Sequence, residues 1–104
     1  MKAGHTPPIV VALEAARALE WRREYKRGGT AIGVARARDL SNGRAVSDAT
    51  IRRMRSYFAR HEIDKAAPGW KRGEPGYPSA GRIAWGLWGG DAGRRWADSR
   101  EIER

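Results

Sequence analysis

The sequence predicts an all-α domain of about five short helices around a tryptophan-rich core. Apolar residues recur at spacings of three and four, and no segment alternates apolar and polar residues as a half-buried strand does. The chain has 104 residues, of which 40% are hydrophobic and five are Trp, enough for one small core. We therefore expect a flexible N-terminal tail over residues 1–8, a single helical domain over 9–98 and a charged C-terminal tail over 99–104.

The first helix is expected to run from about Pro8 to Arg27. Thr6 is a suitable N-cap, Pro is tolerated in a first helical turn, and Gly28-Gly29 can adopt the left-handed conformation that ends a helix. The stripe expected to be buried comprises Val11, Ala15, Ala18, Trp21 and Tyr25.

Similar signals bound the second and third helices. Thr30 can cap a helix that runs to about Ser41, and Ser47 can cap a third helix that runs to about Glu62. Between them, Asn42-Gly43 is a stop signal. The apolar residues expected to pack are Ile32, Val34, Ala35 and Leu40 in the second helix, and Ile51, Met54, Phe58 and His61 in the third.

Helix breakers are concentrated in residues 63–78, which are therefore predicted to form an irregular loop. Ser79 can cap a fourth helix, and Asp91 can cap a fifth. Apolar side chains cover most of the fourth helix, so we expect it to be the central element, with Trp85 and Trp88 in the core.

The charge of the chain indicates a polyanionic partner. The formal net charge is +9, and a basic excess of this kind is typical of proteins that bind nucleic acid. Residues 51–60 contain several Arg and no acid, and helical geometry places Arg52, Arg53, Ser56 and Arg60 opposite the apolar face. Such a face suits a DNA major groove or a row of phosphates. The alternative is an amphipathic helix whose Arg face is merely solvated.

The third helix opens with the pattern Ser-x-x-Thr-Ile-x-Arg at Ser47–Arg53. With the preceding helix, this segment (residues 30–60) resembles a helix-turn-helix, although its linker is longer than the usual 3–4 residues. The resemblance implies that Ser47, Asp48, Thr50 and Arg53 face bases or phosphates. Trp70 lies in the loop beside basic residues and is expected to expose a ring that could stack on a base. The candidate nucleic-acid-binding residues are Arg36, Arg38, Ser47, Thr50, Arg52, Arg53, Ser56, Arg60, Trp70, Lys71 and Arg72.

Other functional classes find little support in the sequence. The chain has no Cys, which excludes a disulfide or thiolate-metal scaffold. His61, Glu62 and Asp64 could in principle hold a metal or shuttle a proton, but we expect His61 to be structural, with no metal and no cofactor. No acid/base constellation indicates an enzyme. No apolar run approaches the ~20 residues of a membrane span and no signal peptide is evident, so we expect an intracellular protein without membrane contact.

Several blocks of the chain form a pattern between Ala15 and Ala97: Arg36–Leu40, Arg53-Met54, Phe58–His61, Asp64-Lys65, Pro78–Trp85, Leu87–Asp91, Gly93 and Trp96-Ala97. This pattern resembles a small domain common in tailed bacteriophages and prophages, which occurs alone or attached to head-maturation (prohead) protease-type proteins. The resemblance implies a viral origin, a place in the host cell cytoplasm or the virion, and proximity to head proteins or packaged DNA. It supplies no reaction.

Together these features predict a phage-encoded, non-enzymatic nucleic-acid-binding protein that uses an Arg-rich helix, with double-stranded DNA favoured. The alternative is a protein–protein interaction module of the phage head or assembly machinery, or an inhibitor of a host protein. No pattern specifies the oligomeric state.

Overall fold

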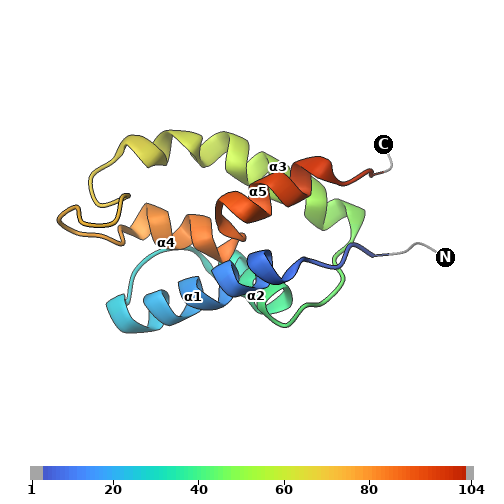
Figure 1. The fold of residues 1–104 in the computed structure, drawn as a ribbon, viewed down its shortest axis with the longest axis horizontal. Coiled ribbons are helices and arrows are strands. Elements are labelled where there is room, and N and C mark those ends of the chain that lie inside the picture. The colour runs from blue at the N-terminus through green and yellow to red at the C-terminus, as the bar shows by residue number, and fades with distance from the viewer. Residues whose placement is uncertain (1–3, 103–104) are drawn as a thin grey trace.

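The computed structural model describes residues 4–102, which form α-helices and no β-strand within that range. The α-helices are α1 (Ile9–Tyr25), α2 (Ala31–Ser41), α3 (Asp48–His61), α4 (Ala80–Leu87) and α5 (Gly90–Ser99), and the 3-10 helix η1 (Glu62–Ala66) follows α3 directly (Figure 1). The predicted all-α class is confirmed. None of the helices in the described range is long and apolar enough to cross a membrane.

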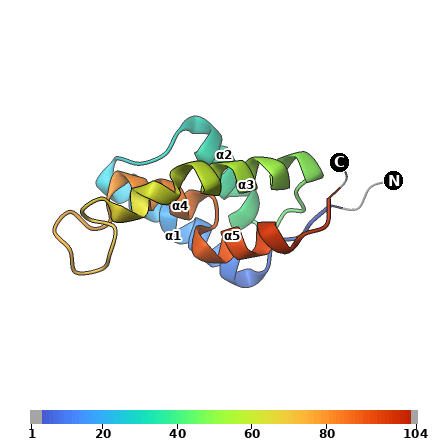
Figure 2. The ribbon, with the colours of Figure 1, turned by 90° about the horizontal axis from the view of Figure 1, so that it is seen from above.

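The helices pack around α4, which contacts α1, α2, α5 and η1. Helix α1 packs against α2, and α3 packs against α5 (Figures 1 and 2). The molecule is elongated, with extents of 47 × 24 × 22 Å. The fourth helix was expected to be the central element because apolar side chains cover most of its surface. The structure agrees, since α4 has neighbours on most of its sides.

Three helices begin at the hydroxyl caps that the sequence indicates. The side chains of Thr30, Ser47 and Ser79 each accept a hydrogen bond from the backbone N–H three residues further along. Each cap satisfies one of the backbone donors left without a partner in a first helical turn. The starts of α2, α3 and α4 are therefore determined by local sequence.

The caps expected for the other two helices are wrong. Helix α1 has Pro8 at its N-cap, with no side-chain hydrogen bond, so Thr6 does not cap it. Helix α5 has Gly89 at its N-cap, in the left-handed region at φ 107°. Asp91 lies in the first turn of α5 instead, where it accepts a hydrogen bond from the indole Nε1 of Trp85 at 3.0 Å.

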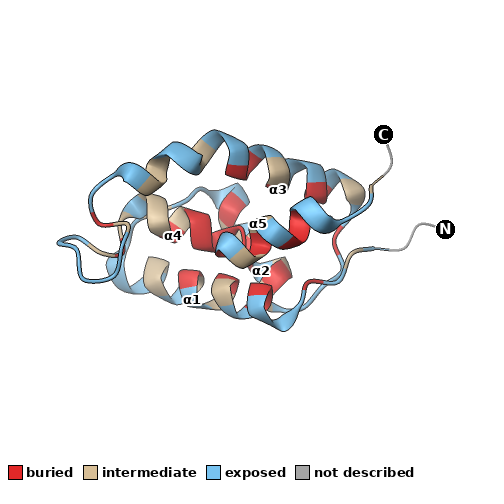
Figure 3. Cartoon of the chain, turned by 45° about the horizontal axis from the view of Figure 1, so that its top comes forward, coloured by how far each residue is buried: buried red, intermediate tan, exposed pale blue. Residues whose placement is uncertain are grey.

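The core contains the two tryptophans that were expected there. Trp85 is 1% exposed and Trp88 is 8% exposed, and the buried residues of all five helices face inward (Figure 3). The Trp85 ring meets Phe58 of α3 edge to face, with centroids 4.7 Å apart. The other core residues include Val11, Ala15, Ala18, Ala37, Leu40, Ile51, Met54, Leu87, Trp96 and Ala97.

The buried faces of the first two helices match the expected stripes only in part: Val11, Ala15 and Ala18 are buried as expected. Tyr25 is 39% exposed and Ile32 is 63% exposed, and Ala35 is also exposed. Leu40 is buried as expected and Val34 is partly buried, but the other buried residues of α2 are Gly33 and Ala37. The reason is the close approach of α2 to α4: a Cβ atom at residue 33 would lie 3.3 Å from the indole nitrogen of Trp88, so this face has no room for a large side chain.

The loop over 63–78 is partly regular and is attached to the body. Its first residues belong to η1. The guanidinium of Arg27 donates hydrogen bonds to the carbonyls of Gly76 and Pro78 at 3.2 and 3.0 Å. The Trp70 ring is half-buried and packs edge to face on Trp85 at 5.4 Å between centroids. Trp70 therefore extends the core, and the expectation of an exposed ring is wrong.

Candidate nucleic-acid interface

The outer face of α3 carries the basic side chains that the sequence places there. Arg52, Arg53, Ser56 and Arg60 are all exposed, while Ile51, Met54 and Phe58 are buried on the opposite side. A 14-residue helix with this division presents its arginines to solvent over most of its length. We call the four exposed residues the arginine face.

Two arginines of this face have no acidic partner. Within residues 4–102, neither Arg53 nor Arg60 forms an ion pair or a side-chain hydrogen bond. The remaining arginine of α3, Arg55, points elsewhere: its Nε donates to the carbonyl of Ala97 at 2.9 Å and its Nη2 donates to the carbonyl of Arg100. Arg55 thus binds the C-terminal end of α5, where free carbonyls and the helix dipole favour a cation.

The acids closest in sequence to the arginine face lie at the ends of α3 and bind residues of other segments. Asp48 at the start of α3 accepts from Nε2 of His5 at 2.7 Å, which attaches the chain before α1 to α3. Glu62 after α3 pairs with Arg94 and Lys65. These acids lie at the two ends of α3, and neither Arg53 nor Arg60 between them has an acidic partner in residues 4–102.

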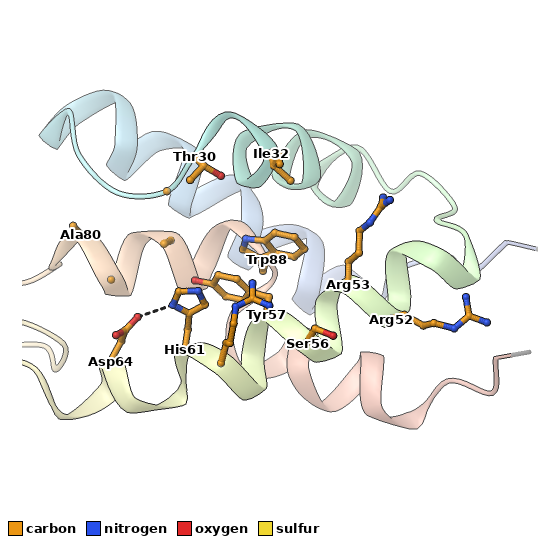
Figure 4. Close-up of a pocket in the computed structure, with 14 residues that line it drawn as sticks. Thr30, Ile32, Arg52, Arg53, Ser56, Tyr57, His61, Asp64, Ala80 and Trp88 are labelled. Atoms are coloured by element: carbon orange, nitrogen blue, oxygen red, sulfur yellow. Dashed lines mark hydrogen bonds and ion pairs between the residues drawn. The ribbon is translucent and has the colours of Figure 1, made fainter. Parts of the chain in front are cut away.

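A pocket of about 640 Å³ lies beside the arginine face (Figure 4). One wall is the N-terminal end of α2, with Thr30 and Ile32. The other wall is α3, with Arg53, Tyr57 and Arg60, and small residues of α4 together with Trp88 form the floor. Ile32, which the sequence suggested for the core, is therefore an exposed apolar side chain at the edge of this pocket.

Three rings stack along the pocket. The rings of Trp88 and Tyr57 are 4.7 Å apart and 9° from parallel, and those of Tyr57 and His61 are 4.5 Å apart and 26° from parallel. The Tyr57 hydroxyl is buried and has no hydrogen-bond partner among the described residues. Burial raises the pKa of Tyr57, and the negative charge of Asp64 adds to this rise while Arg60 opposes it. Tyr57 is therefore a neutral hydroxyl.

His61 is held by its neighbours as a structural residue would be. Its Nδ1 lies 3.1 Å from Oδ2 of Asp64, one turn later, and its ring stacks on Tyr57. No three His, Cys, Asp or Glu side chains in residues 4–102 gather as a metal ion requires.

The other candidate residues lie in several different places. Thr50 is 7% exposed and Ser47 is engaged as the cap of α3, so neither is free to contact a base. The side chain of Arg36 is 12% exposed, pairs with Asp39 at 3.4 Å and lies over the ring of Trp88 at 5.7 Å. Burial lowers the pKa of Arg36; the carboxylate of Asp39 opposes this, and the charge of Arg53 adds to it.

Three further basic candidates are exposed. Arg38 lies on α2, and Lys71 and Arg72 lie in the loop between η1 and α4, at the end of the molecule away from the termini (Figure 1). The backbone N–H of Lys71 donates to the Glu74 carboxylate at 2.9 Å, which closes a turn in this loop. The structure therefore unites Arg52, Arg53, Ser56 and Arg60 on one surface and leaves Lys71 and Arg72 apart from it.

The packing of α2 and α3 departs from a helix-turn-helix. In that motif two successive helices pack together across a turn of 3–4 residues. Here residues 42–47 connect them, α2 packs against α1 and α4, and the pocket lies between α2 and α3. The recognition-helix pattern is present in sequence, but the partner helix is displaced from its usual place.

The pocket itself was missed from sequence. Its floor depends on Ala80, Gly81 and Ala84, which give one side of α4 almost no side-chain volume. A signal for it exists in the spacing: residues 80, 84 and 88 fall on one helical face, with two Ala followed by Trp88. This small-small-large series predicts a hollow only when larger side chains from two neighbouring helices flank it.

Comparisons of the chain with protein-family models, with curated protein sequences and with solved structures found no match.

Proposed function

We propose that this protein binds nucleic acid through the arginine face of α3, by contacts to phosphates. The observation that carries the proposal is the exposure of Arg53 and Arg60 on one side of a helix, with no ion pair to either in residues 4–102. Arg is always charged and its planar fork matches phosphate oxygens. The alternative is that the arginine face is only solvated and binds no partner. That alternative gives no reason for the absence of acidic partners around these arginines.

The resemblance to phage and prophage domains supports double-stranded DNA as the first ligand to test. On this proposal the protein is phage-encoded, has no catalytic activity and acts in the host cell or the virion near packaged DNA. The departure from helix-turn-helix packing removes the main reason to expect base-specific reading. We therefore propose that phosphate contacts supply most of the affinity.

A salt titration tests the proposal. The affinity for duplex DNA, measured by fluorescence polarisation, is expected to fall log-linearly between about 50 and about 200 mM salt. Each phosphate contact contributes a slope of about −0.9 on duplex DNA. Arg53→Ala and Arg60→Ala are each expected to flatten the slope by about one unit. Arg95→Ala, at an exposed position of α5 outside the pocket, is the matched control and is expected to change nothing.

Two results would contradict the proposal. The first is the absence of binding to duplex DNA, single-stranded DNA and RNA at about 50 mM salt. The second is binding whose salt slope responds equally to Arg95→Ala and to the variants of the arginine face.

The exposed apolar face at the start of α1 favours a second candidate function, a protein–protein interaction module. Ile9, Val10 and Leu13 are 69%, 56% and 60% exposed and lie together on one turn of helix. Exposed apolar patches of this kind are typical of interaction sites. Leu13→Glu is expected to abolish binding to a protein partner while DNA affinity is unchanged. Its effect on a pull-down with phage head proteins would distinguish this candidate from the first.

A further inference from the structure

We infer that the pocket between α2 and α3 binds the base of one unpaired nucleotide in a nucleic-acid strand whose backbone lies on the arginine face. This inference rests on the proposed function and names the form of nucleic acid that the site favours. Phosphates alone explain the exposed arginines, but they do not explain an apolar hollow directly beside them.

The dimensions and lining of the pocket suit a planar aromatic ligand. Its volume of about 640 Å³ falls within the range of small-molecule sites, which is roughly 300–1,000 Å³. Ile32 and Tyr57 face it from opposite walls, with Trp88 at its floor (Figure 4), and Ala84 is another lining residue. A flat, largely apolar ring fits between such walls, whereas a phosphate would gain nothing from them.

The charge at the mouth of the pocket complements a nucleotide. Arg53 and Arg60 border the pocket on the α3 side and are free of ion pairs in the described range. The N-terminal ends of α2 and α4, at Thr30 and Ala80, border it on the other sides. Helix N-termini carry partial positive charge, so a strand that places a base inside would find positive potential for its flanking phosphates.

One of the residues that line the pocket carries a polar group without a partner. The Tyr57 hydroxyl is buried and makes no hydrogen bond within residues 4–102, although Tyr57 lines the pocket. A buried hydroxyl without a partner is costly, and a ligand group that reaches it would offset that cost. This observation is independent of the charges at the mouth.

The occupant is expected to be an unpaired base of a strand. A base inside a duplex is stacked on both faces and cannot enter a pocket unless it leaves the helix. The arginine face runs along the α3 side of the pocket from Arg53 to Arg60, which gives contacts for phosphates on either side of the inserted nucleotide. A free nucleotide would use the pocket but not this length of the helix.

The test compares three DNA duplexes of one sequence: a fully paired duplex, one with a single bulged nucleotide, and one with an abasic site at the bulge. The bulged duplex is expected to bind at least about fivefold more tightly than the other two. This ratio corresponds to the lower end of the free energy gained when one base stacks on an aromatic side chain. The abasic duplex has the same backbone distortion and phosphates, so the difference isolates the base.

A pair of matched variants locates the effect. Ala84→Leu fills the floor of the pocket without a change of charge and is expected to remove the preference for the bulged duplex while retaining the salt slope. Ala59→Leu makes the same exchange at an exposed position of α3 outside the pocket, and is expected to retain the preference. Circular dichroism checks that each variant folds, and Ala80→Leu replaces Ala84→Leu if that variant does not.

The outcomes separate the two proposals. Equal binding of all three duplexes, or an unchanged preference in a folded Ala84→Leu protein, would overturn the pocket inference and leave the phosphate proposal intact. Displacement of the bulged duplex by an equimolar nucleoside monophosphate would overturn the assignment to a strand. Failure of every duplex to bind would overturn the proposed function itself.

Discussion

Removal of the Trp88 side chain is the most direct test of how the core and the pocket are built. The ring is 8% exposed and stacks on Tyr57 at 4.7 Å. A buried aromatic side chain removes about 150–250 Å² from water, so at about 25 cal/mol per Å² its loss costs roughly 4–6 kcal/mol. Because the space left by Trp88→Ala opens into the pocket, water can enter it, and we expect a smaller cost of about 3 kcal/mol.

Trp85→Ala provides the comparison. Trp85 is 1% exposed, and its Nε1 donates to Asp91 at 3.0 Å. Its removal leaves a closed cavity and takes a hydrogen-bond donor from Asp91, so we expect a cost near the upper end, about 5 kcal/mol. The two tryptophans differ by three residues in sequence, and their unequal costs follow from the position of the pocket.

Thermal and urea unfolding, followed by far-UV circular dichroism, measure both costs. For a domain of this size each kcal/mol lowers Tm by about 4–8 °C, so Trp88→Ala is expected to lower Tm by about 12–24 °C. A decrease of less than about 4 °C would show that the ring contributes little to the core. A greater loss for Trp88→Ala than for Trp85→Ala would refute the assignment of an open pocket beside Trp88.

Three further predictions concern the packing and charge of the fold. Gly93→Ala is expected to lower the free energy of unfolding, measured by chemical denaturation, by about 1–3 kcal/mol, because the new Cβ atom would lie 2.7 Å from the carbonyl oxygen of Trp88. Gly81→Ala is the control: its Cβ atom would have only ordinary contacts, so we expect this variant to be as stable as wild type or more stable. Arg55→Ala is expected to lower Tm through loss of its bonds to the end of α5 while leaving the salt slope of DNA binding unchanged, and a flatter slope would contradict its structural role. For Asp91, partial burial raises the pKa, but hydrogen bonds from Lys65 and Trp85 outweigh this effect, so the pKa is lowered. The resulting stabilisation is present above the unfolded pKa of about 3.9 and is lost as pH falls. The difference in stability between wild type and Asp91→Asn should therefore shrink from about pH 5 towards pH 2, and a constant difference would contradict this.

The helix starts could be predicted from sequence where a cap acts locally. Thr30, Ser47 and Ser79 each satisfy a backbone donor within their own first turn, and this chemistry needs no tertiary contact. The start of α5 was missed because its cap is Gly89, whose suitability depends on a left-handed backbone and on the tight passage from α4 to α5. Local signals therefore locate helices best where side chains and backbone interact within one turn.

The buried faces were predicted well for α3 and poorly for α2. In α3 the large apolar residues and the arginines are separated by helical period, so Ile51 and Phe58 could only face inward. In α2 the apolar residues are spread around the helix, so the sequence alone does not show which side is buried. The side that faces Trp88 is buried, because Gly33 fits there without a side chain, and Ile32 faces outward. That choice depends on a residue 55 positions from Gly33 along the chain, beyond any periodicity within the helix.

The division of charge also depends on tertiary structure. The sequence shows an excess of arginine but not which arginines remain free. In the folded protein, Arg27 binds loop carbonyls, Arg55 binds the end of α5 and Arg82 pairs with Glu14 at 3.3 Å, so much of the excess is used to hold segments together. Arg53 and Arg60 have no such structural contact in the described range, and both border the pocket. Because their charges stabilise no other part of the fold, replacing either one should alter ligand binding more than stability, and this separation of effects is what distinguishes a binding face from a structural one.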